Sequence, residues 1–136
     1  MAAPNSGTGA NRNVPARKYA IRNPRTGVWL ATRVEVARTV WARGRGLLGR
    51  RGLTPGEGLF IPSCNSIHSF FMAFRFDALF IDKQWRLVHA IDAMSPFRIS
   101  PIVWRADGVV ELPAGTIQQS GTRIGDNLEP VALDEA

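Results

Sequence analysis

Cys64 and His68 are the residues whose types most readily suggest chemistry, because a thiolate and an imidazole serve as nucleophile and base in many hydrolases. They lie in the stretch CNSIHSFFMAFRFDALFID (64–82), which holds the only cysteine of the chain. A nucleophile and its base must approach to about 3 Å. Four residues along a strand separate them by about 13 Å, whereas a helical turn brings their Cβ atoms to about 6 Å. Both are therefore weak catalytic candidates, and a cysteine packed as a small hydrophobe is preferred.

The same residue types do not predict a metal centre. A structural zinc needs four Cys or His ligands, or three with a carboxylate, and the chain offers only Cys64, His68 and His89, without CxxC or HxxxH spacing. Aspartates such as Asp77 and Asp82 are expected to accept backbone N–H bonds where strands end. The sequence has no phosphate-binding loop, dinucleotide fingerprint or Gly-x-Ser-x-Gly turn. We therefore expect no metal and no cofactor.

The elements that must position these side chains are predicted to be mostly strands. If residues 66–76 are extended, the even-numbered positions form a bulky face that points to the core. That face consists of His68, Phe70, Met72, Phe74 and Phe76. Glu111 lies in the apolar strand VVELP, where alternation favours an outward side chain and an inward carboxylate would need a partner.

The rest of the chain predicts a mainly β fold. Further strands are expected at 18–23, 28–37, 59–61, 78–81, 86–91, 102–104, 108–112 and 128–133. Apolar spacing predicts one short helix near 35–43, and AGTIQQSG predicts a helical turn near 114–121 that ends at Gly121. The class is a β-rich α+β fold, a sandwich or jelly-roll-like sheet or a partly closed barrel, with mostly antiparallel strands. Residues 1–16 are predicted to be a flexible tail and residues 17–136 a single β-rich domain.

Charge is divided unevenly along the chain. Residues 1–51 carry a net charge of +10, and residues 52–136 carry −4. Solvated arginines explain this excess most simply, and a basic face for an anionic partner is the alternative. The sequence has no apolar run of roughly 18 residues, so we expect no membrane span. The lone cysteine and the polar N-terminal sequence predict a cytoplasmic protein.

Several motifs, taken in order, resemble the domain of unknown function 192 (DUF192) family over residues 20–130. They are GLLGR (46–50), Cys…Ile-His-Ser…Phe-Met (64–72), FDALFID (76–82), ELPAG (111–115) and Gly-Asp (125–126). The family commonly has threonine where Ser69 stands, Pro-Ile where Arg75 and Phe76 stand, and glycine in the hairpin after Asp82. The resemblance implies a mostly β, sandwich or jelly-roll-like fold. It implies no activity, because the family has no established catalytic residues.

The missing catalytic motifs favour a small non-enzymatic domain that binds an unknown small ligand or protein partner. The ligand-binding candidates are His68, Ser69, Asp77, Glu111, Arg50 and Arg51, with the two arginines forming an anion-binding edge.

Two other function classes remain open. A small hydrolase-like enzyme would use His68, Cys64 or both, and it predicts a carboxylate within hydrogen-bond reach of an imidazole that opens to a cleft. A protein that associates with nucleic acid or another anionic surface would bind it through the basic residues 12–51. That third class is the least favoured, because only Tyr19, Trp29 and Trp41 are available for stacking and no known nucleic-acid module is present.

Overall fold

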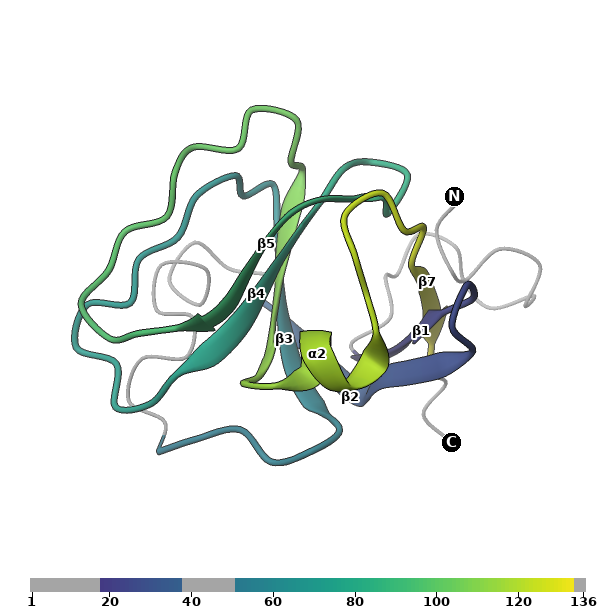
Figure 1. The fold of residues 1–136 in the computed structure, drawn as a ribbon, viewed down its shortest axis with the longest axis horizontal. Helices are drawn as coiled ribbons and strands as arrows, with labels where there is room; N and C mark the ends of the chain where they lie inside the picture. Colours follow the sequence, from purple (N-terminus) through teal and green to yellow (C-terminus); the bar gives the residue numbers. More distant parts are fainter. Residues whose placement is uncertain (1–17, 38–50, 134–136) are drawn as a thin grey trace.

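The protein has a mainly β fold in the computed structural model, which describes residues 18–37 and 51–133 (Figure 1). The described residues contain seven strands: β1 (Lys18–Asn23), β2 (Val28–Val36), β3 (Glu57–Pro62), β4 (Phe76–Ile81), β5 (Leu87–Met94), β6 (Gly108–Pro113) and β7 (Glu129–Ala132). One short helix, α2 (Thr116–Ser120), follows β6. The mainly β class and the mostly antiparallel pairing are therefore confirmed.

The seven strands form one mixed sheet rather than two separate sheets. Their order is β5-β4-β6-β3-β2-β1-β7, and only β2 and β3 pair in parallel. The two ends of the sheet approach each other, because the start of β5 is bonded to the chain just before β7. Arg86 pairs with Asn127 in an isolated bridge, and the Leu87 N–H donates to the Asp126 carbonyl at 2.8 Å. The result is a curled sheet that resembles a partly closed barrel.

The sheet has a hydrophobic core on each face. One cluster, inside the curl, joins residues of β1 and β2 such as Ile21 and Val34 to Leu79 of β4 and Leu112 of β6. The other cluster lies on the opposite face, where Ile67 and other apolar residues from the loops pack onto β3, β4 and β6. All six residues of β4 are buried, because both of its faces are covered. This explains why its sequence, FDALFI, shows little polar alternation.

Most predicted elements appear in the structure with their ends moved by at most three residues. The strands expected near 18–23, 28–37, 59–61, 78–81, 86–91, 108–112 and 128–133 are all present. The helical turn near 114–121 is also confirmed as α2, and it ends at Gly121 in the left-handed region at φ 68°. None of the helices in the described ranges is long and apolar enough to cross a membrane.

Two predicted strands are wrong. Residues 66–74 form an irregular loop in which only His68 makes a β-bridge, with Ile99. The extension breaks because the Met72 N–H donates back to the Ser69 carbonyl at 3.2 Å, which makes a turn. Residues 102–104 are also irregular, and there the Val103 N–H bonds to the Asn65 carbonyl of the other loop instead of a strand. We call these segments loop 63–75 and loop 95–107.

The start of the helix predicted near 35–43 is also wrong. Glu35 and Val36 belong to β2, where they pair in parallel with Leu59 and Phe60 of β3. The Ala37 N–H extends this pairing by donating to the Phe60 carbonyl at 2.9 Å. The β-branched Val34 and Val36 favour this extended backbone. The remainder of that helix prediction, residues 38–43, lies outside the described residues, as does the predicted tail 1–16.

Candidate functional site

His68 and Cys64, the candidate base and nucleophile, both lie in loop 63–75. The Cys64 thiol donates to the Ser66 carbonyl at 3.1 Å. His68 is exposed, and its Nδ1 accepts the Phe70 N–H at 3.2 Å while its ring stacks on Phe70 with centroids 5.1 Å apart. Both of these contacts are with residues of loop 63–75. The action of Cys64 and His68 as a catalytic pair stays a prediction. In the part of the chain that the structure describes, no group of three His, Cys, Asp or Glu side chains is placed to hold a metal.

Ser69 is fully buried and joins loop 63–75 to loop 95–107. Its hydroxyl donates to the Ser95 carbonyl and accepts the Arg98 N–H at 2.9 Å. Its backbone N–H donates to the Arg98 carbonyl, and its carbonyl accepts the Phe97 N–H, both at 2.8 Å. All polar groups of Ser69 thus hold the two loops together, and a direct role in ligand binding stays a prediction.

Asp77 is fully buried at the start of β4 and binds backbone groups of two other elements. Its Oδ1 accepts the Ala93 N–H at 2.8 Å and the Gly115 N–H at 3.3 Å, and its Oδ2 accepts the Ile117 N–H at 2.8 Å. Three N–H donors compensate the burial of this carboxylate. Asp77 thus accepts backbone N–H bonds at a strand end, as expected, and it links β4 to β5 and to the start of α2. The sequence could not reveal these partners, because both are distant, and a direct role in ligand binding stays a prediction.

Glu111 is buried on β6, with only 4% of its surface exposed. It stands between Leu59 of β3 and Ala78 of β4, two members of the core opposite the inside of the curl. The outward orientation favoured by alternation is therefore wrong. Alternation failed because β6 is covered on both faces, so the polar position of the strand does not meet solvent.

Of the two arginine candidates, the structure describes only Arg51, which lies apart from the other candidates. Arg50 falls outside the described residues. Arg51 is exposed and lines a depression with Leu53, Thr54 and Glu57, none of which is another candidate. Among the other described candidates, His68 and Ser69 are neighbours in loop 63–75, and Asp77 and Glu111 lie on the paired strands β4 and β6.

A cluster of exposed apolar side chains surrounds His68 and Ser69. Phe97 of loop 95–107 meets Phe71 and Phe70 of loop 63–75, with ring centroids 5.4 and 6.5 Å apart. The His68 bridge to Ile99 continues the contact between the loops. We call His68, Phe70, Phe71, Phe97 and Ile99 the aromatic surface.

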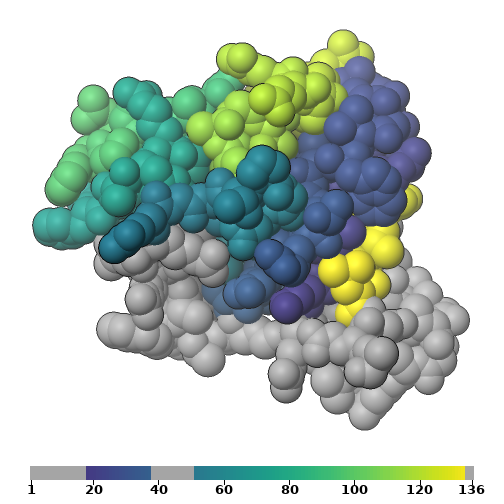
Figure 2. Space-filling model, turned by 90° about the horizontal axis from the view of Figure 1, so that it is seen from below, coloured from purple at the N-terminus to yellow at the C-terminus, as the bar shows by residue number. Residues whose placement is uncertain are grey.

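The aromatic surface is exposed to a degree that calls for an explanation. Phe71, Ile99 and Phe97 are 75%, 69% and 54% exposed. Single exposed apolar residues are common on soluble proteins, but contiguous apolar patches mark sites that bind proteins, ligands or membranes. The two loops run side by side at one end of the long axis of the molecule, in teal and green (Figures 1 and 2). The aromatic surface therefore belongs to a projecting end of the protein.

The charged side chains in the two segments that carry the aromatic surface are all basic. Residues 64–76 and 95–100 contain two basic side chains, Arg75 and Arg98, and no acidic residue. Both arginines are exposed, and each guanidinium bonds a nearby backbone carbonyl at 3.4 Å, that of Ala93 and that of Phe97. The two segments that carry the apolar cluster therefore have a net positive charge, which suits an anionic partner.

The backbone at two of these phenylalanines is strained. Phe71 has φ 63° and Phe97 has φ 60°, in the left-handed region that bulky residues rarely adopt. Such a conformation costs about 1 kcal/mol or more at each residue and concentrates at functional sites. Both rings are exposed, and glycine could adopt this backbone conformation without the steric cost. The presence of phenylalanine at both positions supports a function for the exposed rings.

Sequence reasoning missed Phe71, Phe97 and Ile99 and placed Phe70 in the core. A signal for the second loop was present, because MSPFRISP sets large apolar residues between two prolines that disfavour a strand. Large apolar residues in such a loop have few neighbours to cover them. No comparable signal marks Phe71, whose exposure follows from the turn at Ser69.

The protein matches one family model over most of its length. The model, DUF192, is described as "Uncharacterized ACR" and matches residues 21–130. The chain belongs to the DUF192 family. Another relative, a UPF0127 protein of Thermococcus sibiricus, is 30% identical over 106 residues, which cover 75% of this chain and 68% of that protein. The resemblance seen in the sequence motifs is confirmed.

Two solved structures are similar to this DUF192 chain. One, from Sinorhizobium meliloti 1021 and described as a proposed transcription regulator, has a TM-score of 0.75 and 25% identity, and covers 86% of this chain and 96% of its own. The other, from Novosphingobium aromaticivorans and of unknown function, has a TM-score of 0.72 and 19% identity, and covers 95% and 97%. The second likeness shows the fold alone. Because the DUF192 family is uncharacterised, function must be argued from the surface itself.

Proposed function

We propose that the protein is a non-enzymatic binding domain whose aromatic surface docks on anionic lipid bilayers. The observation that carries this proposal is the outward display of Phe71 and Phe97 from strained backbone on loops that Ser69 holds together. Phenylalanine side chains enter the boundary between head groups and acyl chains, and arginines beside them attract anionic lipids.

The shape of the site favours a bilayer over a peptide. Peptide ligands commonly enter a groove or add a strand to a sheet edge. Here the apolar side chains project from loops at the end of the molecule, and they suit a broad and soft apolar layer. The same surface positions Arg75 and Arg98 to contact phosphate groups at the level of the lipid head groups.

The expected affinity is modest and reversible. Full burial of one phenylalanine side chain contributes about 1.5–3 kcal/mol, and each basic residue near an anionic bilayer adds about 1 kcal/mol. Partial insertion of three apolar side chains with two arginines therefore gives several kcal/mol, which corresponds to dissociation constants between about 1 mM and 1 μM. The cytoplasm is the location that we propose, because the lone Cys64 suits a reducing compartment and the cytoplasmic leaflet is anionic.

Co-sedimentation with vesicles tests this function. The full-length protein is mixed with vesicles of phosphatidylcholine alone or of phosphatidylcholine with phosphatidylglycerol. We expect binding to the anionic vesicles only, and we expect it to weaken as salt rises from about 0.1 to 1 M. Arg98→Gln should weaken binding about fivefold, since one arginine contributes about 1 kcal/mol. Arg123→Gln removes one exposed charge outside the aromatic surface and serves as the matched control.

Three outcomes contradict the proposal. One is an absence of binding to either type of vesicle, and another is equal binding to both. The third is a concentration-dependent dimer in the absence of lipid that Phe71→Gly dissolves, because it assigns the aromatic surface to a second copy of the chain. Light scattering at several protein concentrations detects that dimer.

Nucleic-acid binding is a second candidate, favoured by the description of the Sinorhizobium meliloti structure and by the +10 charge of residues 1–51. Two basic side chains of that segment are already engaged, since Arg25 pairs with Asp126 and Arg33 with Glu57. DNA binding that weakens steeply between about 50 and 200 mM salt would support this candidate. Binding that is absent or unchanged over that range would remove it.

A further inference from the structure

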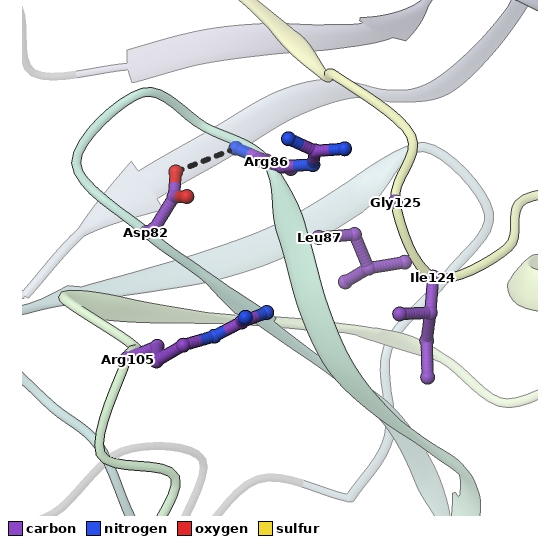
Figure 3. Close-up of a pocket in the computed structure, with 6 residues that line it drawn as sticks. All are labelled: Asp82, Arg86, Leu87, Arg105, Ile124 and Gly125. Atoms are coloured by element: carbon purple, nitrogen blue, oxygen red, sulfur yellow. Dashed lines mark hydrogen bonds between the residues drawn. The ribbon is translucent and has the colours of Figure 1, made fainter.

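A second surface, distinct from the aromatic surface, has the composition of a small anion site. It is a cavity of about 510 Å³ between the turn after β4, the start of β5, the end of loop 95–107 and the loop before β7 (Figure 3). This size is within the usual range for small-molecule pockets. The lining residues are Asp82, Arg86, Leu87, Arg105, Ile124 and Gly125.

Two guanidinium groups of the cavity have no acidic partner within residues 18–37 and 51–133. Arg86 and Arg105 come from different segments, and both side chains are exposed. Among the described residues, neither guanidinium forms an ion pair or a side-chain hydrogen bond, in contrast to Arg25 and Arg33. Figure 3 shows the Arg105 side chain extending from its loop toward the start of β5, where Arg86 lies. Arg86 and Arg105 line the same cavity, and the planar guanidinium forks of both residues can donate to the oxygens of a phosphate group.

The carboxylate of Asp82, the acidic residue that lines the cavity, accepts hydrogen bonds from backbone N–H groups. The Asp82 Oδ1 accepts the Gln84 N–H and the Arg86 N–H, each at 2.9 Å, and so holds the turn between β4 and β5 (Figure 3). This aspartate reduces the net positive charge of the cavity but leaves both guanidiniums open. Leu87 is 1% exposed and packs in the core, so the exposed Ile124 offers the apolar contact beside the charged end.

The walls are held in place by bonds between distant segments. The Gly125 N–H donates to the Leu87 carbonyl at 2.8 Å, and the Asp107 N–H donates to the Ile81 carbonyl at 2.7 Å. The loop before β7 is fixed further by Asp126, which accepts Arg25 Nε at 2.6 Å and the Arg123 N–H at 2.9 Å. A site built on such walls needs little rearrangement to bind a ligand, and this lowers the cost of binding.

The geometry points to a binding site for a phosphate monoester with a short apolar substituent, with the phosphate bound by Arg86 and Arg105 and the substituent against the exposed Ile124. The proposal does not depend on the membrane function, because it uses none of the residues of the aromatic surface. A soluble organic phosphate and the head group of a phosphatidic acid share this chemistry. The experiment below separates these two sources.

Nuclear magnetic resonance titrations of the full-length protein test the site with butyl phosphate and with dihexanoyl phosphatidic acid as probes. We expect saturable shifts of the Arg86, Leu87 and Gly125 amides with one or both probes, and the tighter probe identifies the source. Arg105→Gln should weaken binding about tenfold, the value expected for a lost charge-assisted hydrogen bond. Arg123→Gln, in the loop that also supplies Ile124, is the control and should bind almost as the natural chain does.

A variant with the opposite sign strengthens the test. Asp82→Asn keeps an oxygen that can accept the two backbone N–H bonds but removes the negative charge, so it should tighten the binding of butyl phosphate severalfold. Unperturbed spectra outside the cavity confirm that each variant is folded. The site is refuted if neither probe gives saturable shifts, if the shifts lie elsewhere, or if Arg105→Gln and Arg123→Gln bind equally well.

Discussion

The strand β4 and the loop that precedes it both carry phenylalanines, but they use them in opposite ways. In β4, Phe76 and Phe80 are 1% and 0% exposed and contribute to the core. In loop 63–75, Phe71 is 75% exposed at a strained φ of 63°. The residue type is the same, and the difference lies in whether a neighbouring strand and a covering layer are present. Phenylalanine in β4 therefore serves stability, and we propose that the exposed Phe71 in the loop serves recognition.

The largest expected effect comes from truncating a ring in the sheet. Phe80→Ala should lower the free energy of unfolding by about 3–5 kcal/mol, because it leaves a cavity in a closely packed core. Phe71→Ala should change it by less than about 0.5 kcal/mol, since the ring is mostly in solvent. Urea unfolding followed by circular dichroism measures both. Equal losses would mean that the two regions do not differ as described.

Removing the hydroxyl that joins the loops should have an intermediate effect. Ser69→Ala leaves the partly buried Arg98 N–H and Ser95 carbonyl without the Ser69 hydroxyl, at a cost of about 1–3 kcal/mol. Amide exchange of Phe97 and Arg98 should accelerate, while exchange in β4 stays slow. Ser95→Ala, whose carbonyl remains, is the control. Unchanged exchange at Phe97 would show that Ser69 does not hold the aromatic surface.

Acid should weaken the closure of the sheet rather than the loops. Burial by itself would raise the pKa of Asp126, but hydrogen bonds from Arg25, the Arg123 amide and Asn23, together with the charge of Arg25, lower it to about 2. A carboxylate whose folded pKa lies below its usual value of 3.8 stabilises the fold above that value. This stability, about 1–2 kcal/mol after allowance for the half-exposed Arg25, should be lost as the pH falls from about 4 to 2. Urea unfolding across this range measures it, and Arg25→Gln should flatten the dependence.

The smallest effect concerns the strained backbone. Phe71→Gly relieves the left-handed conformation and should leave the free energy of unfolding unchanged or raise it by up to about 1 kcal/mol. Thermal unfolding compares it with Phe71→Ala, which keeps the strain. A clear loss of stability in Phe71→Gly alone would show that the ring is part of the packing and not kept for binding.

The sequence was sufficient to predict the mainly β class, most strands, α2 and the family. These follow from local alternation, turn residues and motif order, which are properties of neighbouring residues. The buried orientation of Glu111 and the contacts of Asp77 were out of reach, because they depend on strands and a helix far away in the chain. The ring of Phe70 was misplaced in the core because alternation assumes an extended backbone, and the turn at Ser69 ends that extension. The ligand-binding roles of all six candidates stay predictions: His68, Ser69, Asp77, Glu111, Arg50 and Arg51.

The partition of the protein onto anionic vesicles with and without its two strained rings tests the central claim most directly. The double variant Phe71→Gly, Phe97→Gly is compared with Trp104→Ala, which removes an 81% exposed ring that makes no ring contact with the described members of the aromatic surface. We predict that the double variant remains folded and binds phosphatidylcholine–phosphatidylglycerol vesicles at least about thirtyfold more weakly, a loss of about 2 kcal/mol, while Trp104→Ala binds as the natural chain does. Equal binding by all three proteins would contradict the account.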